Sequence, residues 1–306
     1  MYLLYGLMCL IFGTTFLAIK IGIAAGAPPF IFAGTRFLAA GAVVLMSLKL
    51  TGTPVSLSLS QRKDAVFIGA TMTATLFGCL YWGEQYISSS AAALLSSTAP
   101  LMIVLIEFFQ GRKDAFSCKL LGLFAALLGV SIALYPSIRS ESGWLAAAAV
   151  VVILLSEAAY AFGAIRSRHT LETGLSPFLL NGWQMIFGGA MLVLLSLIAG
   201  ESWQLDLAEN IYLTWLYLVI LGSLAGHGIY YWLIRTAGPL LPSTWTYVSP
   251  IIAQIVGFWI LAEYLSLWSF VGLLFVLGGV SVVSQARIIE VWIRKGKNTI
   301  SAKNTF

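Results

Sequence analysis

Charged residues are scarce in this sequence. Asp, Glu, Lys and Arg make up 9% of its 306 residues, whereas a soluble globular domain carries about 25%. Hydrophobic residues make up 59% of the chain. This composition excludes an ordinary soluble protein and indicates a chain that lies mostly inside a lipid bilayer.

Motifs for metals, cofactors and nucleotides are also missing. The three cysteines, Cys9, Cys79 and Cys118, lie in or beside apolar segments, without the paired spacing of a disulfide framework or a metal site. The stretch GTTFLAIK lacks the G-x-x-x-x-G-K-[ST] pattern of a phosphate loop. We therefore expect no cofactor and no metal, and any energy for transport would come from an ion gradient or from the gradient of the substrate itself.

Alternation of polar and apolar residues, which marks the strands of a membrane β-barrel, is absent from runs such as GWLAAAAVVVILL. A helix needs about 20 mostly apolar residues to cross the bilayer. The first apolar stretch has neither a basic start nor a clear cleavage site, so we expect it to remain as a helix. The sequence predicts an all-α polytopic membrane protein with ten transmembrane helices, near residues 2–23, 30–48, 65–86, 91–110, 116–135, 143–164, 176–199, 211–233, 240–261 and 267–287.

The positive charges are distributed by membrane side. If the N-terminus is cytoplasmic, the opposite side holds only Arg139, while Lys20 and Arg36 lie within helices. The positive-inside rule therefore predicts that both termini are cytoplasmic. The net charge of +5 then reflects topology and contact with anionic lipid, not nucleic-acid binding. The cytoplasmic loops and tail would hold fourteen of the seventeen basic residues: Lys49, Arg62, Lys63, Arg112, Lys113, Lys119, Arg166, Arg168, Arg235, Arg287, Arg294, Lys295, Lys297 and Lys303.

The two halves of the chain resemble each other. Residues 81–135 match residues 231–285 at an offset of 150, with Pro100 opposite Pro250, and a second register at an offset of 148 pairs "GA" at 41–42 with "GA" at 189–190. Each half contains five predicted helices, an odd number, so the second copy must enter the membrane inverted. We expect a first repeat at 1–140, a second at 141–287 and a basic cytoplasmic tail at 288–306.

Three stretches carry a family resemblance: IFGTTFLAIKIGI at 11–23, PPF at 28–30 followed by Arg36 in GTRFLAAGA, and the segments centred on Pro100 and Pro250. Over essentially the whole chain, the sequence resembles the EamA-type family of the drug/metabolite transporter superfamily. The resemblance implies ten helices in two inverted repeats and transport of small molecules, often export of amino acids or related metabolites. The second half departs from the first at Glu157 and at Gln184, which stands opposite Arg36, so a site based on charge would not be symmetric.

Polar residues recur at helical spacing in four predicted helices, so each set lies on one face. Such stripes are suited to a cavity for an amphipathic metabolite. Alternatively, the hydroxyl groups bond their own helix or a neighbour, and the prolines only bend helices for packing. The candidate substrate-binding residues are Thr75, Trp82, Ser97, Pro100, Tyr230, Ser243, Tyr247, Pro250 and Gln254.

Ionisable residues within membrane helices are costly and therefore count as functional candidates. Glu157 and His227 lie deepest, and we expect them to handle a coupling proton, although a neutral His227 bonded to a carbonyl explains its position equally well. Arg36 and Glu84 lie toward the outer ends of their helices, where we expect a structural ion pair.

Together with the family resemblance, which implies the substrate class and the outward direction, these observations predict a secondary transporter of a bacterial cytoplasmic (inner) membrane that moves an amino acid or a similar metabolite outward by alternating access. Its partners would be the small-molecule substrate, the lipid bilayer and a coupling proton, and the chain would act as a monomer or homodimer. An intramembrane hydrolase built on Ser223 and His227 is a distant alternative, because no G-x-S-x-G elbow accompanies them. Efflux of cationic amphiphilic drugs is the nearer alternative, with cation-π contacts from Trp82, Trp232, Trp245 and Tyr247.

Overall fold

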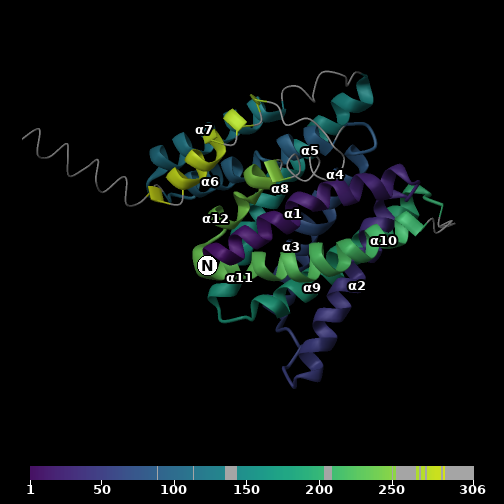
Figure 1. The fold of residues 1–306 in the computed structure, drawn as a ribbon. Helices are drawn as coiled ribbons and strands as arrows, with labels where there is room; N and C mark the ends of the chain where they lie inside the picture. The colour runs from purple at the N-terminus through teal and green to yellow at the C-terminus, as the bar shows by residue number, and fades with distance from the viewer. Residues whose placement is uncertain are drawn as a thin grey trace, which may run out of the picture.

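The computed structural model describes residues 1–87, 89–112, 114–134, 143–202, 209–249, 251–252, 267–268, 270–272, 274–283 and 285–286 (Figure 1). All regular elements in these residues are helices. Shorter apolar helical stretches cover Leu94–Phe109, which includes the turn between α5 and α6, and Phe116–Gly129 and Phe270–Val283. Six helical segments are long and apolar enough to cross a membrane: Tyr2–Ala24, Pro29–Leu50, Leu59–Gly83, Trp144–Glu172, Pro177–Ala199 and Ile211–Ala237.

The helices of the first half begin and end at residues that the sequence marks. Pro29 opens α2 in its first turn, where a missing N–H costs nothing. Ser58 and Gln61 form a capping box at the start of α3. The elements are α1 (Tyr2–Ala24), α2 (Pro29–Leu50), α3 (Leu59–Ile68), η1 (Gly69–Thr75), α4 (Leu76–Gly83), α5 (Ser89–Ser96), α6 (Ala99–Phe109) and α7 (Phe116–Leu134).

The second half repeats several of these signals. Pro177 lies in the first turn of its helix, α9, as Pro29 does in α2. The same helix ends at Gly200, whose φ of 68° is a left-handed conformation that glycine adopts without strain. The elements are α8 (Trp144–Glu172), α9 (Pro177–Ala199), α10 (Glu209–Tyr217), η2 (Leu218–Gly226), α11 (His227–Ala237) and α12 (Leu240–Ser243).

Two of the long helical segments contain π-helix in their middle. The π-helix η1 joins α3 to α4, and η2 joins α10 to α11. A π-helix bonds each residue to the fifth one along and is rare, but it occurs frequently at functional sites. Shifted by 150 residues, η1 falls on residues 219–225, inside η2. The irregular turns thus occupy equivalent places in the two halves.

The helix around Pro100 is broken, not merely bent. α5 ends at Ser96 and α6 begins at Ala99, so that Pro100 lies in the first turn of a new helix. At the break, the Ser97 hydroxyl donates to the Leu94 carbonyl oxygen at 2.5 Å, and the following hydroxyl, of Thr98, donates at 2.7 Å. These bonds satisfy backbone groups that membrane lipid could not. Two of the candidate substrate-binding residues, Pro250 and Gln254, lie outside the described residues.

Glycines bring helices of the two halves into backbone contact. A Cβ atom on Gly41 of α2 would lie 2.9 Å from the Gly182 carbonyl oxygen of α9, and one on Gly34 would lie 3.1 Å from that of Gly189. The two helices therefore run antiparallel along each other. α7 and residues 270–283 meet in the same way, because a Cβ atom on Gly129 would lie 2.6 Å from the Gly272 carbonyl oxygen. Small residues permit this approach between membrane helices.

The buried apolar side chains form two large clusters that meet at the centre of the molecule. Phe77 of α4 and Trp245, which follows α12, pack against both clusters. Both side chains also line a central cavity. The packing of the core therefore places the walls of this cavity.

Candidate functional site

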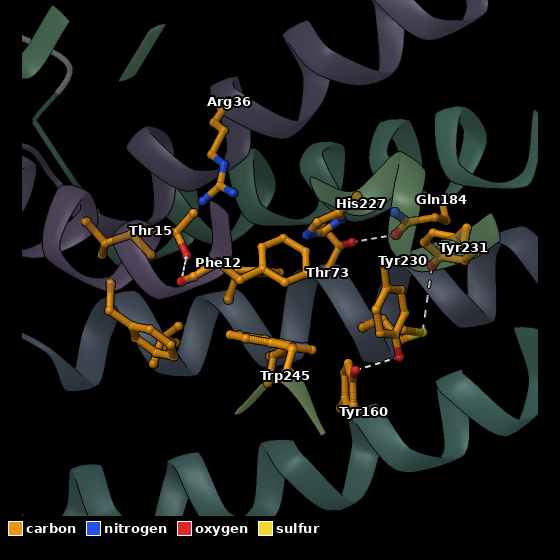
Figure 2. Close-up of a pocket in the computed structure, with 16 residues that line it drawn as sticks. Phe12, Thr15, Arg36, Thr73, Tyr160, Gln184, His227, Tyr230, Tyr231 and Trp245 are labelled. Atoms are coloured by element: carbon orange, nitrogen blue, oxygen red, sulfur yellow. Dashed lines mark hydrogen bonds between the residues drawn. The ribbon is translucent and has the colours of Figure 1, made fainter. Parts of the chain in front are cut away.

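A central cavity lies between helices of both halves (Figure 2). Its free volume for the centre of a water-sized molecule is about 40 Å³, and the unfilled space between its walls, open solvent included, is about 520 Å³. Its walls come from α1, α2, η1, α4, α8, α9, α11 and the residue Trp245. The lining residues are Phe12, Thr15, Phe16, Ile19, Arg36, Met72, Thr73, Leu76, Phe77, Leu80, Tyr160, Gln184, His227, Tyr230, Tyr231 and Trp245.

Aromatic rings form much of the wall. The Phe12 and Trp245 ring centroids are 4.5 Å apart, and Phe16 lies beside the same indole at 5.9 Å. Across the cavity the Tyr160 hydroxyl donates to the Tyr230 hydroxyl, linking α8 to α11 (Figure 2). A pocket with apolar and aromatic walls and a few polar groups is the usual form of a small-molecule site.

Among the described residues that line the cavity, Arg36 is the one Lys or Arg. The side chain is buried, with 1% of its surface exposed. Its Nε donates to Ser223 Oγ at 2.9 Å, and its Nη1 donates to the Tyr81 hydroxyl at 2.8 Å. The guanidinium carbon lies 4.7 Å from the Phe37 ring centroid and 5.3 Å from that of Phe77. Hydroxyl groups and aromatic faces thus hold the guanidinium in place.

The expected ion pair between Arg36 and Glu84 is not present in the structure. Among the described residues, both carboxylate oxygens of Glu84 are buried without a hydrogen-bond partner. Lys20 Nζ instead donates to the backbone carbonyl oxygens of Glu84 and Ile87, at 2.5 and 3.1 Å. Glu84 lies at the C-terminal end of α4, and Arg36 donates instead to hydroxyl groups of α4 and η2.

The contact between Gln184 and Thr73 is the uncharged equivalent of the contact between Arg36 and Ser223. The Thr73 hydroxyl of η1 donates to the Gln184 side-chain oxygen, whereas Ser223, which takes the bond from Arg36, belongs to η2. Shifted by 150, Thr73 corresponds to Ser223, and Gln184 corresponds to Arg36 at the other offset. Equivalent contacts therefore join the two halves in two places, one through the charged Arg36 and one through the neutral Gln184.

His227 lies in the wall between aromatic rings. Its ring centroid is 5.5 Å from that of Phe12, 5.6 Å from that of Phe37 and 5.7 Å from that of Phe77. Its Nδ1 has no hydrogen-bond partner in the described residues. The Ser223 hydroxyl accepts from Arg36, and no bond joins it to His227 in that part of the chain. The pair is therefore not arranged as a nucleophile and its base.

Glu157, the other coupling candidate, lies outside the cavity lining. It is buried in α8, the Ser96 hydroxyl interacts with its carboxyl group, and its Oε1 has no partner in the described residues. No hydrogen bond links it to His227 within those residues. The two candidates for a proton relay are therefore not in direct contact.

The structure brings only some of the predicted binding residues to the cavity. Tyr230 lines the cavity, whereas Thr75 and Trp82 line a separate groove with Cys79 and residues of α8 and α9. Ser97 and Ser243 donate to carbonyl oxygens of their own segments, Leu94 and Leu240. Pro100 is buried in α6, and Tyr247 packs into another cluster, its hydroxyl group without a partner in the described part of the chain.

The cavity also contains residues that the sequence reasoning did not select, notably Thr73 and Tyr160. Thr73 was missed because the spacing rule assumed an α-helix, whereas η1 is a π-helix, whose wider turn rotates the following residues around the axis. The repeat held a usable signal, because Thr73 stands opposite Ser223 at the same offset that pairs the prolines. Tyr160 lies one turn after Glu157 in α8, and no pattern distinguished it.

The profile of the EamA-like transporter family matches the chain twice, over residues 1–135 and 147–285. The chain therefore belongs to the EamA-like transporter family. It is 30% identical over 259 residues to "Uncharacterized inner membrane transporter YedA" of Escherichia coli (strain K12), which covers 84% of this chain and 81% of the relative. It is 23% identical over 269 residues to "Protein PecM" of Dickeya dadantii (strain 3937), covering 85% and 89% of the two chains.

One solved crystal structure has the same fold. It superposes with a TM-score of 0.76 at 16% identity, and the match covers 94% of this chain and 98% of the other. With the family match and the apolar helices, these likenesses identify the chain as a membrane transporter of the EamA/DMT type and as a multi-pass protein of a bacterial inner membrane.

Proposed function

We propose that this member of the EamA-like transporter family is a secondary transporter that moves a small organic metabolite, an amino acid or a derivative, outward across the membrane. The observation that carries the proposal is the central cavity, which is walled by helices of both halves and combines aromatic rings with a few polar groups. A site between two repeats is the usual place for the substrate of such transporters.

Alternating access would come from rocking two inverted repeats of five helices each, at 1–140 and 141–287. The glycine contacts support this arrangement, because Gly34 meets Gly189 and Gly41 meets Gly182, while the sequence offset of 148 equates Gly34 with Gly182 and Gly41 with Gly189. Such an exchange of partners is what a two-fold axis requires. Ten spans with both termini in the cytoplasm, and the tail at 288–306 on the same side, fit the distribution of Lys and Arg.

Efflux of cationic drugs has less support from the cavity. Its aromatic rings would suit a cation, but the Arg36 guanidinium in the same wall would repel one. A hydrolase also has little support, because the Ser223 hydroxyl is engaged by Arg36 and not by His227. We therefore place the chain among transporters and not among enzymes.

Transport and its direction can be tested in proteoliposomes that contain the purified protein. Vesicles of defined orientation are loaded with labelled L-phenylalanine or another amino acid, and exchange with unlabelled amino acid outside is measured. We expect protein-dependent exchange that saturates with concentration, and net flux from the side that carries Lys63 and Arg168. Absence of saturable flux for any of the twenty amino acids and their N-acetyl derivatives would contradict the proposal.

A further inference from the structure

The geometry points to Arg36 as the residue that binds a carboxylate group of the substrate, so that the cavity selects organic monoanions and zwitterions over neutral and cationic analogues. The inference rests on the proposed function and specifies the chemistry of the same site. It assigns to Arg36 a role in specificity, in place of the structural ion pair that its sequence position suggested.

Arg36 lacks a countercharge in the part of the chain that the structure describes. Arg36 is 1% exposed, and it forms no ion pair among the residues that the structure describes. The described lining of the cavity contains no Asp or Glu. A buried charge is costly unless it is paired, and neutral hydroxyl groups stabilise a guanidinium without neutralising it. An anionic ligand would supply the countercharge that the described protein does not.

Arg36 also keeps N–H donors that its bonds to described residues do not use. A guanidinium has five N–H groups in a rigid fork. The two printed bonds of Arg36, to Ser223 and to the Tyr81 hydroxyl, use Nε and Nη1, and Nη2 donates no bond within the described residues. The aromatic faces of Phe37 and Phe77 fix the plane of the fork. Free donors in a fixed plane at a cavity wall are suited to a carboxylate.

The lining of the cavity also limits the charge and the shape of a ligand. The described lining contains one guanidinium and no lysine, so it matches a single carboxylate better than a dianionic phosphate. Across the space from Arg36, the rings of Phe12 and Trp245 offer an apolar surface (Figure 2). We therefore expect the carboxylate to be attached to an apolar or aromatic group.

The repeat provides a structural control for the mutation that removes the charge. At the position that corresponds to Arg36, Gln184 bonds the Thr73 hydroxyl, as Arg36 bonds that of Ser223. A glutamine thus already occupies the equivalent place in this fold. Arg36→Gln should therefore fold, and it should be at least as stable as the parent, because it removes a buried charge without a countercharge.

The test measures binding to the purified full-length protein from the shift of its thermal unfolding temperature with ligand concentration. The probes share one ring: phenylacetate, L-phenylalanine, phenylacetamide and phenethylamine. We expect the parent to prefer the two carboxylates, and Arg36→Gln to weaken their binding by about ten- to a hundredfold, as for loss of a hydrogen bond to a charged group. Arg36→Lys should retain part of the preference, since it keeps the charge and loses the fork.

Two controls separate the inference from its alternatives. Arg168→Gln removes a charge outside the cavity lining, where Arg168 pairs with the exposed Glu172, and it should leave the preference unchanged. Glu84→Gln should also leave it unchanged. If Glu84→Gln abolished the preference as fully as Arg36→Gln, the guanidinium would serve an internal pair, and the inference would be wrong.

Equal stabilisation of the parent by phenylacetate and phenylacetamide, or by phenethylamine, would also overturn the inference. So would a marked loss of stability in unliganded Arg36→Gln, because that would indicate a structural charge. Failure of the inference is distinguishable from failure of the proposed function. Saturable flux of neutral or cationic probes would contradict only the carboxylate-binding role of Arg36. Carboxylate binding without any flux would contradict only the proposed transport function.

Discussion

Gly122 packs directly against Gly279, so that a Cβ atom on Gly122 would lie 2.7 Å from the Gly279 carbonyl oxygen. A Cβ atom on Gly279 would in turn lie 2.6 Å from the backbone nitrogen of Ala126. The backbone of α7 therefore touches the backbone of the helix that contains Gly279, which is yellow in Figure 1. The next glycine, Gly278, has no atom within 4 Å of an added Cβ.

We expect Gly279→Val to destabilise the protein by about 1–3 kcal/mol, the usual cost of forcing extra volume into a packed interface. Gly278→Val introduces the same side chain one residue earlier in the same helix, and it should change stability little. Thermal unfolding of the two variants in one detergent gives the comparison. Equal unfolding temperatures would show that the close contact contributes nothing to stability.

The end of α9 is tied to the start of α2 by a carboxylate. Glu201 accepts from the backbone N–H groups of Phe30 and Ile31 at 2.8 and 2.9 Å, one with each carboxylate oxygen. These donors have no partner within the helix, and a negative charge at a helix N-terminus is favourable.

Glu201→Ala should therefore lower the free energy of unfolding by about 1–2 kcal/mol, as for the loss of a helix cap. Glu201→Gln keeps one acceptor and should lose less. Glu172→Ala is the matched control, because Glu172 is exposed and pairs with Arg168 and His169 along its own helix, where such pairs contribute about 0.5 kcal/mol. Thermal unfolding measures all three, and a Glu201→Ala effect no larger than that of Glu172→Ala would contradict the capping role.

Pro100 should influence turnover more than insertion. Alanine at this position can donate the missing backbone bond and join α5 to α6, which would remove the break at 97–98. We expect Pro100→Ala to reach the membrane normally and to exchange substrate several-fold more slowly. Pro177→Ala, at the first turn of α9, should leave the rate nearly unchanged. Equal turnover in Pro100→Ala/Pro250→Ala and in the parent would show that the prolines serve only packing.

Single-cysteine variants in a background without Cys9, Cys79 and Cys118 can test the topology. With both termini cytoplasmic, an impermeant thiol reagent should label positions 63, 168 and 297 only from inside and position 139 from outside. Labelling of position 63 in intact cells would contradict the inverted-repeat arrangement, because the orientation of every following helix depends on it.

Local signals in the sequence predicted the six helical segments that are long and apolar enough to cross a membrane, whereas ten spans stay a prediction. Pro29 and Pro177 mark the first turns of α2 and α9, and long apolar runs fix the segments that they open. These features depend on neighbouring residues, so the sequence contains the information directly. Around Pro100 the sequence predicted one bent helix, whereas the structure shows two helices, α5 and α6.

The site was harder to predict, because its contacts join elements that are distant in the sequence. The periodicity of an α-helix selected Thr75 for the cavity, whereas the turn of η1 presents Thr73. The hydroxyl of Ser97 was expected to face a ligand, but it bonds its own carbonyl neighbour at the break. The partners of Arg36 come from α4 and η2, and only the packed structure shows that hydroxyl groups, not Glu84, surround it.

Glu157 remains the best candidate for a coupling residue. It is buried in α8, its Oε1 has no partner among the described residues, and the Ser96 hydroxyl interacts with its carboxyl group. An ionised carboxylate in such a place would be costly without a countercharge. A cycle of protonation and release there could therefore be linked to the movement of the helices around it.

Glu157→Gln keeps the shape of the side chain but cannot exchange a proton. We expect it to retain substrate binding and exchange, and to lose accumulation driven by a pH gradient in proteoliposomes. Glu84→Gln is the matched control, because Glu84 is equally buried, with both oxygens unpartnered in the described residues, and it should keep gradient-driven accumulation. His227→Asn provides a second arm. Loss of gradient-driven accumulation in both variants would assign the two residues to one proton relay, in which other groups connect them. Intact accumulation by Glu157→Gln would remove the residue from the mechanism and favour facilitated diffusion or another coupling site.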